Sequence, residues 1–122
     1  MDQKEGYQYA KDFGIISGED NFFKGYFILF KVKELNLGEK TLLSLVLSYT
    51  NRRMEFYMSN NIISEVLGIS RKSVINLIGS LKDKNLIETV LEDTGAGVPK
   101  RYIKINKRMY NNLIRKYNGT TN

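Results

Sequence analysis

Hydrophobic side chains recur at intervals of three and four residues in four segments of the chain, which is the period of an amphipathic α-helix. The segments are residues 39–51, 60–67, 71–84 and 107–117. The side chains expected to face inward are Leu42, Leu43, Leu45, Val46 and Tyr49, then Ile62, Ile63, Val66 and Leu67, then Val74, Leu77, Ile78 and Leu81, and finally Met109, Tyr110, Leu113 and Tyr117. We therefore predict four helices, the first running from near Gly38–Glu39 to about Asn51.

Capping residues set the limits of the second and third helices. Ser59 and Ser70 precede them, and serine side chains accept hydrogen bonds from the first free amides of a helix. Gly68 and Asn85 follow them and suit the left-handed conformation in which helices end. The second and third helices are thus expected to be joined by a very short turn.

Shorter segments carry the signals of strands. LIETVLED and KRYIKIN flank the turn TGAGVP and predict a β-hairpin. MEFYM, at residues 54–58, alternates and predicts a small strand that joins the same sheet. Residues 21–35 are rich in aromatic and β-branched residues and predict a strand, or a loop with a short strand. Their expected core residues are Phe22, Phe27, Leu29 and Phe30.

The segment NNIISEVLGISRKSVINLIG, residues 60–79, has the pattern of a helix-turn-helix. We expect a side chain at Gly68 to clash in the turn, and Ser64 to let the two helices approach closely. Apolar residues lock the pair together, namely Ile63, Leu67, Ile69, Val74 and Leu77. The alternative is an ordinary helical hairpin in an unrelated core.

With its apolar stripe removed, the third helix leaves a polar face. The outward residues are predicted to be Arg71, Lys72, Ser73, Asn76 and Ser80, with Ile75 and Gly79 at the margins. Arginine or lysine suits guanine O6 and N7, asparagine suits adenine N6 and N7, and the serines, Ser70 included, suit bases or phosphates. The alternative is that these residues form a solvated helix face. However, the positive charges of Arg71 and Lys72 are unfavourable near the positive end of the helix dipole, and this placement favours a role in binding.

Charge is separated along the chain, whose net charge is +6. Residues 1–20 hold five acidic and two basic residues, whereas residues 100–122 hold seven basic residues and no acidic one. A basic surface of this kind favours a polyanionic partner. In the hairpin, we expect the tip from Gly95 through Gly97 to Lys100 and Arg101 to meet the minor groove or phosphates, while the acids of the first strand face away. A plain edge hairpin is the competing interpretation.

The absence of certain residues narrows the function further. The chain has no histidine and no cysteine, so it lacks the commonest transition-metal ligands and the usual general base and thiolate nucleophile. We therefore expect no metal, no cofactor and no enzymatic activity. No apolar run is long enough to cross a bilayer, and a cytoplasmic protein is expected.

From about Phe22 to Asn106, the chain resembles the small winged helix-turn-helix domains of Gram-positive phage and plasmid proteins. The resemblance rests on FFKGYFILF, LGEKTLLSLVLSYTNR, MSNNIISEVLGISRKSVINLIGSLKDKNLIE and KRYIKIN. Similar domains occur in replisome organisers, in replication initiators and in the winged-helix accessory protein of the clostridial conjugation relaxosome. The resemblance implies an α+β, mainly α fold with a three-helix core, a hairpin wing and a C-terminal helix.

We expect an acidic flexible arm at residues 1–20, a winged helix-turn-helix domain at 21–117 and a disordered tail at 118–122. The predicted function is sequence-specific binding of double-stranded DNA, as an accessory protein at repeated sites in an origin of conjugative transfer or replication. A relaxase or replication protein would then be a partner, and a homodimer on DNA is a further expectation. The alternatives are a transcriptional regulator that acts by operator occupancy and a winged-helix protein-interaction module.

Overall fold

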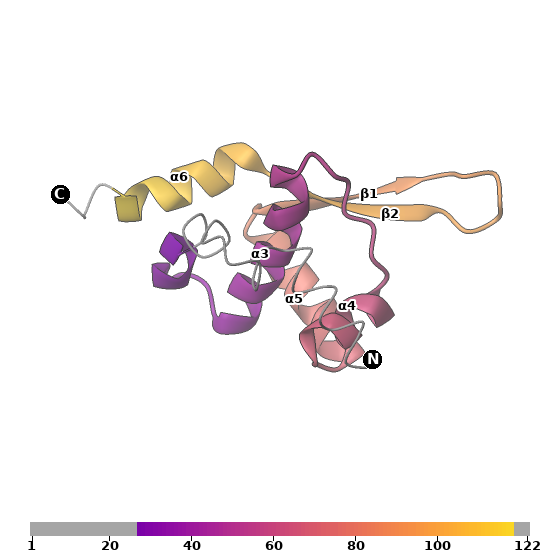
Figure 1. Cartoon of the computed structure of the whole chain (residues 1–122), viewed down its shortest axis with the longest axis horizontal. Coiled ribbons are helices and arrows are strands. Elements are labelled where there is room, and N and C mark those ends of the chain that lie inside the picture. The colour runs from indigo at the N-terminus through magenta and orange to yellow at the C-terminus, as the bar shows by residue number, and fades with distance from the viewer. Residues whose placement is uncertain (1–26, 119–122) are drawn as a thin grey trace.

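The computed structural model describes residues 27–118 and has a winged helix-turn-helix fold (Figure 1). Its elements are the 3₁₀ helix η1 (Phe27–Lys31), the helices α3 (Leu37–Asn51), α4 (Asn60–Leu67) and α5 (Arg71–Asp83), the strands β1 (Ile87–Glu92) and β2 (Lys100–Ile105), and the helix α6 (Lys107–Asn118). The predicted arm at 1–20 lies outside the described residues, as does the predicted tail except Asn118, which ends α6 instead.

Helix α3 forms the centre of the molecule. It starts with a capping box, in which Asn36 Oδ1 accepts a hydrogen bond from the Glu39 amide and Glu39 Oε1 accepts one from the Asn36 amide. Residues 42–48 are buried without interruption, because η1, α5 and β2 all contact this helix. The predicted helix is therefore confirmed, but it is enclosed rather than amphipathic.

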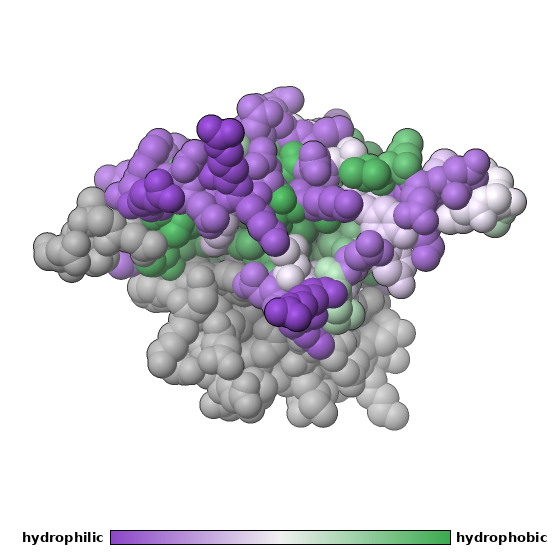
Figure 2. Space-filling view, turned by 90° about the horizontal axis from the view of Figure 1, so that it is seen from above, coloured by the Kyte–Doolittle hydropathy of each residue, from purple (hydrophilic) through white to green (hydrophobic). Residues whose placement is uncertain are grey.

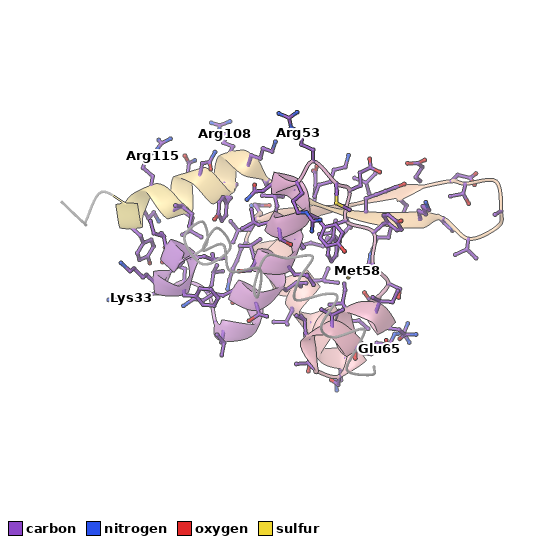
Figure 3. All side chains as sticks on the ribbon, in the orientation of Figure 1. Lys33, Arg53, Met58, Glu65, Arg108 and Arg115 are labelled. Carbon is purple, nitrogen blue, oxygen red and sulfur yellow. The ribbon has the colours of Figure 1, made fainter. Side chains whose placement is uncertain are left out.

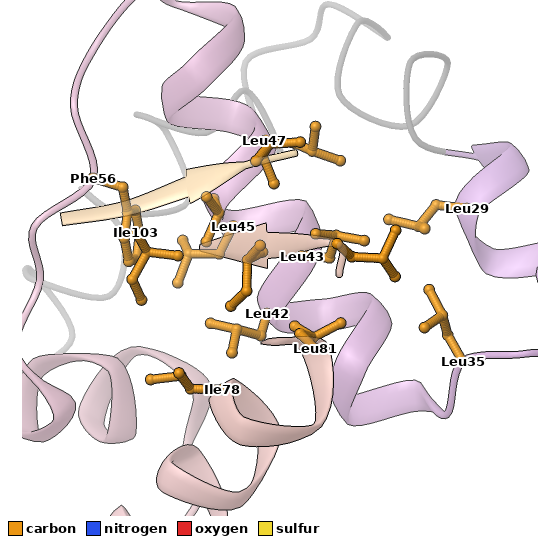
Figure 4. Close-up of a cluster of buried hydrophobic side chains, with 14 of the residues drawn as sticks. Leu29, Leu35, Leu42, Leu43, Leu45, Leu47, Phe56, Ile78, Leu81 and Ile103 are labelled. Atoms are coloured by element: carbon orange, nitrogen blue, oxygen red, sulfur yellow. The ribbon is translucent and has the colours of Figure 1, made fainter. Parts of the chain in front are cut away.

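The hydrophobic core lies where α3 meets the other elements (Figure 4). Labelled members include Leu29 and Leu35 from the N-terminal segment, Phe56, Ile78 and Leu81 of α5, and Ile103 of β2. These contacts pack α5 against α3 along one side and leave its opposite side uncovered. The core thus positions α5 with an outward-facing surface.

The strand prediction for residues 21–35 is wrong for the part that the structure describes. Residues 27–31 form a 3₁₀ helix, and Leu29, Val32 and Leu35 are buried. Leu29 lies in the 3₁₀ helix, and Val32 and Leu35 follow it in the segment before α3, so their spacing of three differs from the two-residue alternation of a strand. Phe30 is 37% exposed, contrary to its prediction as a core residue, while Phe22 and the side chain of Phe27 lie outside the described part.

The hairpin is confirmed, with β1 and β2 antiparallel in a register that pairs Ile87 with Ile105 and Glu92 with Lys100. The predicted strand at 54–58 is reduced to a single β-bridge, in which the Ile103 amide donates to the Phe56 carbonyl at 2.9 Å. Phe56 is buried there and anchors the segment. The side chain, rather than a ladder of hydrogen bonds, fixes this strand-like segment.

Helix α6 closes the core beside η1 (Figure 1). Tyr110, Leu113, Ile114 and Tyr117 pack on the core, whereas Met109 is 37% exposed, contrary to its predicted inward position. The Tyr117 hydroxyl donates to Glu34 and accepts from the Lys33 amide at 3.0 Å. Helix α6 is thus held by its apolar side, and its opposite side is exposed.

Candidate nucleic-acid interface

A short turn joins α4 to α5 and fixes the angle between them. Gly68 has a φ of 69°, and its amide donates to the Ser64 carbonyl at 2.9 Å. The Ser64 hydroxyl donates to the Ile69 carbonyl across the turn. The predicted ending at Gly68 is confirmed, but the predicted clash is wrong, because an added Cβ would meet nothing within 4 Å. Glycine is required there for its positive φ, which other residues rarely adopt.

Both helices of the pair begin at the predicted caps. Ser59 Oγ accepts from the Ile62 amide, and Ser70 Oγ accepts from the Ser73 amide at 3.0 Å. Ser70 also donates its hydroxyl to Ser73 Oγ at 2.9 Å. Ser70 and Ser73, both predicted to contact DNA, therefore have a structural role in starting α5.

Helix α5 presents a continuous outer face. Arg71, Lys72, Ile75 and Asn76 are exposed, and their spacing of one, four and five residues places them on one side of a helix. Gly79 follows one turn later on the same side, and an added Cβ there would meet nothing within 4 Å. Ile75 is 49% exposed, so its apolar side chain forms part of this surface. The face combines cations, an amide and an apolar side chain.

Ser80 does not face outward as predicted. Its hydroxyl donates to Glu39 Oε2 at 2.5 Å, and Lys84 Nζ donates to the same oxygen at 2.6 Å. Glu39 is only 1% exposed. Burial raises the pKa of its carboxyl, but the hydrogen bonds from Lys84, Ser80 and the Asn36 amide outweigh that effect and hold the pKa below its usual range. This network joins the start of α3 to the last turns of α5.

Arg101 does not lie at a free wing surface either. Its guanidinium donates to Asn60 Oδ1 at 2.5 Å and to the Met58 carbonyl at 2.7 Å. Burial lowers the pKa of this guanidinium, and its Nε has no hydrogen-bond partner. Arg101 therefore connects β2 to the start of α4 and orients the wing, because the side chain is committed to these acceptors.

Lys100 is exposed at the start of β2, next to the loop of the wing. Its ammonium lies 4.7 Å from the ring centroid of Tyr57, a cation–π distance. The predicted separation of acids and bases is wrong here, because Glu92 pairs with Lys100 and Glu88 with Lys104 in the register. Residues opposite each other in an antiparallel pair share a face of the sheet. Gly95 and Gly97 lie in the exposed loop with positive φ values, as a tight turn requires.

A groove of about 360 Å³ brings the helix-turn-helix and the wing together. It is lined by Tyr57, Met58, Ser59, Asn60, Asn61, Arg71, Pro99, Lys100 and Arg101. Of the predicted site residues, Arg71, Lys100 and Arg101 line this groove. Lys72 and Asn76 are exposed farther along α5, and Gly95 and Gly97 lie outside the groove, in the loop of the hairpin. The groove is polar and open, as a surface for an extended polar ligand should be.

Sequence reasoning missed Tyr57 and Asn61, which line this groove and are exposed. The signal for Tyr57 was present in the alternation of residues 54–58, because a buried Phe56 requires its neighbour to face outward. Asn61 had no such signal. Its place depends on the angle at which the wing meets α4, which Arg101 determines.

The comparisons with known proteins agree with this geometry. Residues 33–87, a little under half of the chain, match a family model described as a helix-turn-helix domain. The match covers α3, α4 and α5 and ends at the first residue of β1. No curated protein and no solved structure matches the chain significantly.

Among residues 27–118, no helix is long and apolar enough to cross a membrane. Nor does the same range contain a cluster of carboxylates, histidines or cysteines that could hold a metal ion.

Proposed function

We propose that this protein binds double-stranded DNA in a sequence-specific manner, with α5 in the major groove and the base of the wing against the sugar–phosphate backbone. The observation that carries the proposal is the exposed face of α5, where Arg71, Lys72, Ile75 and Asn76 follow the turn of a helix-turn-helix. In such domains the N-terminal part of the second helix meets base edges. No catalytic step is part of the proposal.

Each side chain of this face has a role that its chemistry supports. Arg71 or Lys72 donates to guanine O6 and N7, and Asn76 exchanges two hydrogen bonds with adenine N6 and N7. Ile75 stands between them and suits the methyl group of thymine, because apolar contact is the only recognition that this group allows. The target site would then contain guanine, adenine and thymine within one turn of the duplex.

The wing supplies contacts of a different kind. Lys100 is exposed at the edge of the groove that Arg71 also lines. A backbone phosphate there would be contacted without regard to sequence, and such contacts fix the register of a protein on the duplex. Arg101 supports this arrangement indirectly through Met58 and Asn60.

As to biological process, we propose an accessory role at repeated sites in an origin of conjugative transfer or replication of a mobile element. The support is the resemblance of residues 22–106 to domains that serve such origins. A relaxase or replication protein would be the partner at the origin, and paired half-sites would recruit a homodimer. A regulator acting by operator occupancy would use the same face of α5.

The test is a titration of the protein with duplex fragments from its own genetic neighbourhood and with a scrambled duplex of equal composition. We expect one fragment class to bind at least about 10³-fold more tightly than the scrambled duplex. Arg71→Ala and Asn76→Ala should each cost about 1–3 kcal/mol on the specific duplex and little on the scrambled one.

A matched control is Lys82→Ala, which removes an exposed cation near the other end of α5. Equal binding to all duplexes would contradict sequence-specific recognition. Absence of binding to every duplex would contradict the proposal as a whole and favour a protein-interaction module. Footprints at a promoter rather than at an origin would favour the transcriptional regulator.

A further inference from the structure

A second basic surface lies away from α5. Its members are Arg53, Lys107, Arg108 and Arg115, all of them exposed. Figure 3 shows Arg53, Arg108 and Arg115 projecting from the upper edge of the molecule, whereas α4 and α5 lie at the lower edge. We call these four residues the α6 basic surface.

The surface is continuous because of the helix geometry. Arg108 and Arg115 are seven residues apart, which is two turns and about 10 Å along α6. They therefore point to the same side, opposite the packed residues Tyr110, Leu113 and Tyr117. Arg53, which follows α3 with a φ of 58°, lines one hollow together with Lys107.

The charges of this surface are not neutralised by the protein. Among the described residues, Lys84 pairs with Glu39 and Lys116 with Glu34, whereas none of the four cations has a carboxylate partner. Glu55 also lines the hollow of Arg53 and Lys107, but among the described residues no ion pair joins it to either cation. Lys104, which also lines that hollow, belongs to the hairpin and faces Glu88 across it.

The polar groups between the cations point to phosphates as ligands. Asn111 and Asn112 are exposed between Arg108 and Arg115, so amide donors alternate with guanidinium groups along α6. Figure 2, seen from above, shows a largely hydrophilic face over this helix. Arginine binds phosphate in a bidentate manner, and asparagine adds neutral donors.

We infer that the α6 basic surface binds the backbone of a second DNA segment, so that one protein molecule holds two duplexes. This inference rests on the proposed function, because α5 and the wing must hold the first duplex. A straight duplex lying against α5 does not reach the opposite edge, since the core of the protein stands between the two surfaces. Contacts at the second surface are to phosphates and independent of sequence.

The test is a capture experiment with two duplexes. The specific duplex is immobilised, the protein is bound to it, and a fluorescent scrambled duplex is added in solution. Wild-type protein should retain the fluorescent duplex, and Arg108→Gln/Arg115→Gln should lower that retention about tenfold or more at low salt, because two phosphate contacts are lost. The variant should bind the immobilised duplex as the wild type does.

Two further variants control for charge and folding. Lys33→Gln/Lys82→Gln removes the same charge from exposed positions elsewhere and should leave retention unchanged. Arg108→Lys/Arg115→Lys keeps the charge and should restore much of the retention. Sedimentation of the protein alone establishes that the wild type and the glutamine variant have the same oligomeric state.

The outcomes separate this inference from the proposed function. If wild-type protein binds no duplex, the proposed function itself fails. If it binds the specific duplex but never retains the second one, or if Arg108→Gln/Arg115→Gln retains it as the wild type does, only this inference is overturned. Retention lost equally in the Lys33→Gln/Lys82→Gln control would also overturn it, because the effect would then come from net charge.

Discussion

Glu39 shows how one buried carboxylate positions the proposed reading helix. It caps α3 through Asn36 and also accepts hydrogen bonds from Ser80 and Lys84, near the other end of α5 from Arg71. The hydrogen-bond donors around this buried carboxylate compensate for its loss of water, but removal of the carboxylate would leave those donors without an acceptor. The residue therefore fixes the distance between the central helix and the proposed DNA-binding helix.

Replacing this carboxylate should destabilise the fold. We expect Glu39→Gln to lower the free energy of unfolding by about 2–3 kcal/mol, because Lys84 loses its counter-ion and one hydroxyl loses a charged acceptor. Urea unfolding at neutral pH measures this. Ser80→Ala, which removes only one donor, should cost less, and an equal or larger loss in Ser80→Ala would contradict the central role of the carboxylate.

The pH dependence follows from the sign of the pKa shift. The pKa of Glu39 is lowered in the folded protein, so its stabilisation is present above the unfolded value of about 4.3 and is lost as the pH falls through the lower folded value. The stability difference between wild type and Glu39→Gln should therefore shrink on acidification below about pH 4. A difference that stays constant down to pH 2 would contradict this account.

Gly79 is the residue of α5 that local propensity does not explain. It lies in the helix without a positive φ, and a Cβ would meet nothing. We expect Gly79→Ala to raise the free energy of unfolding by about 0.5–1 kcal/mol, because glycine in a helix is costly. Chemical unfolding measures this, and destabilisation would reveal a contact that the structure does not show.

The same position tests the reading face. The larger Gly79→Leu would project from the outer side of α5, and we expect it to weaken the specific duplex several-fold while the protein remains folded. Asn111→Leu, which introduces the same side chain at an exposed uncharged position on α6, is the matched control. Unchanged affinity in Gly79→Leu would mean that DNA does not approach this turn.

Single polar residues were the hardest part of the site to predict. Arg71, Lys72 and Asn76 are exposed, as predicted. Their exposure could be predicted because the apolar residues of the same helix determine which side faces the core. Ser80 and Arg101 were expected at the surface but bind partners 41 residues away in the chain. The local sequence pattern gives no information on partners so far away. It therefore does not tell whether a hydroxyl or guanidinium group near a predicted surface faces solvent or binds another part of the chain.

At the scale of elements, helices were predictable because their caps are local. Ser59, Gly68, Ser70 and Asn85 lie where the sequence placed them, and Asn85 has the expected positive φ of 60°. The 3₁₀ helix at residues 27–31 was not predictable, because its aromatic and β-branched residues favour a strand in general. Burial of Leu29 against α3 and α6 decided its conformation instead.

Two neighbouring cations of β2 have different roles, because Arg101 is bound within the structure whereas Lys100 is exposed. We expect Arg101→Ala to lower the free energy of unfolding by about 2 kcal/mol, because two charge-assisted hydrogen bonds to α4 and its preceding loop are lost. Lys100→Ala should change stability by less than about 0.5 kcal/mol, as exposed substitutions do. Thermal unfolding distinguishes them, and equal stabilities for the two variants would contradict the anchoring role of Arg101.

In DNA binding, we expect the order to be reversed: Lys100→Ala should change the salt dependence of the affinity more than Arg101→Ala does. Lys100→Ala should reduce the slope of log affinity against log salt by about 1, the loss of one phosphate contact. Arg101→Ala should weaken binding with a smaller change in slope, because its charge is held by Asn60 and Met58. A larger change for Arg101 would mean that its guanidinium leaves these partners to meet the backbone.

At the scale of the whole molecule, the arrangement of charge distinguishes the two proposed surfaces. The α5 face and wing combine Arg71, Lys72 and Lys100 with groups that we propose to read bases, whereas the groups of the α6 basic surface suit phosphates alone. A chain with a net charge of +6 binds DNA more weakly as salt rises in any case. Affinity at one salt concentration therefore cannot separate the surfaces, but the salt slope for each duplex can.

For the first duplex, we expect Lys100→Gln to reduce the slope of log affinity against log salt by about 1 and Arg108→Gln/Arg115→Gln to leave that slope unchanged. The second duplex should show the opposite response, since its contacts lie on α6. Fluorescence titrations from low to physiological salt, with the two duplexes labelled separately, measure both slopes on one sample. If both variants changed both slopes equally, the cations would act through one common field, and the protein would have a single DNA-binding surface that extends around the molecule.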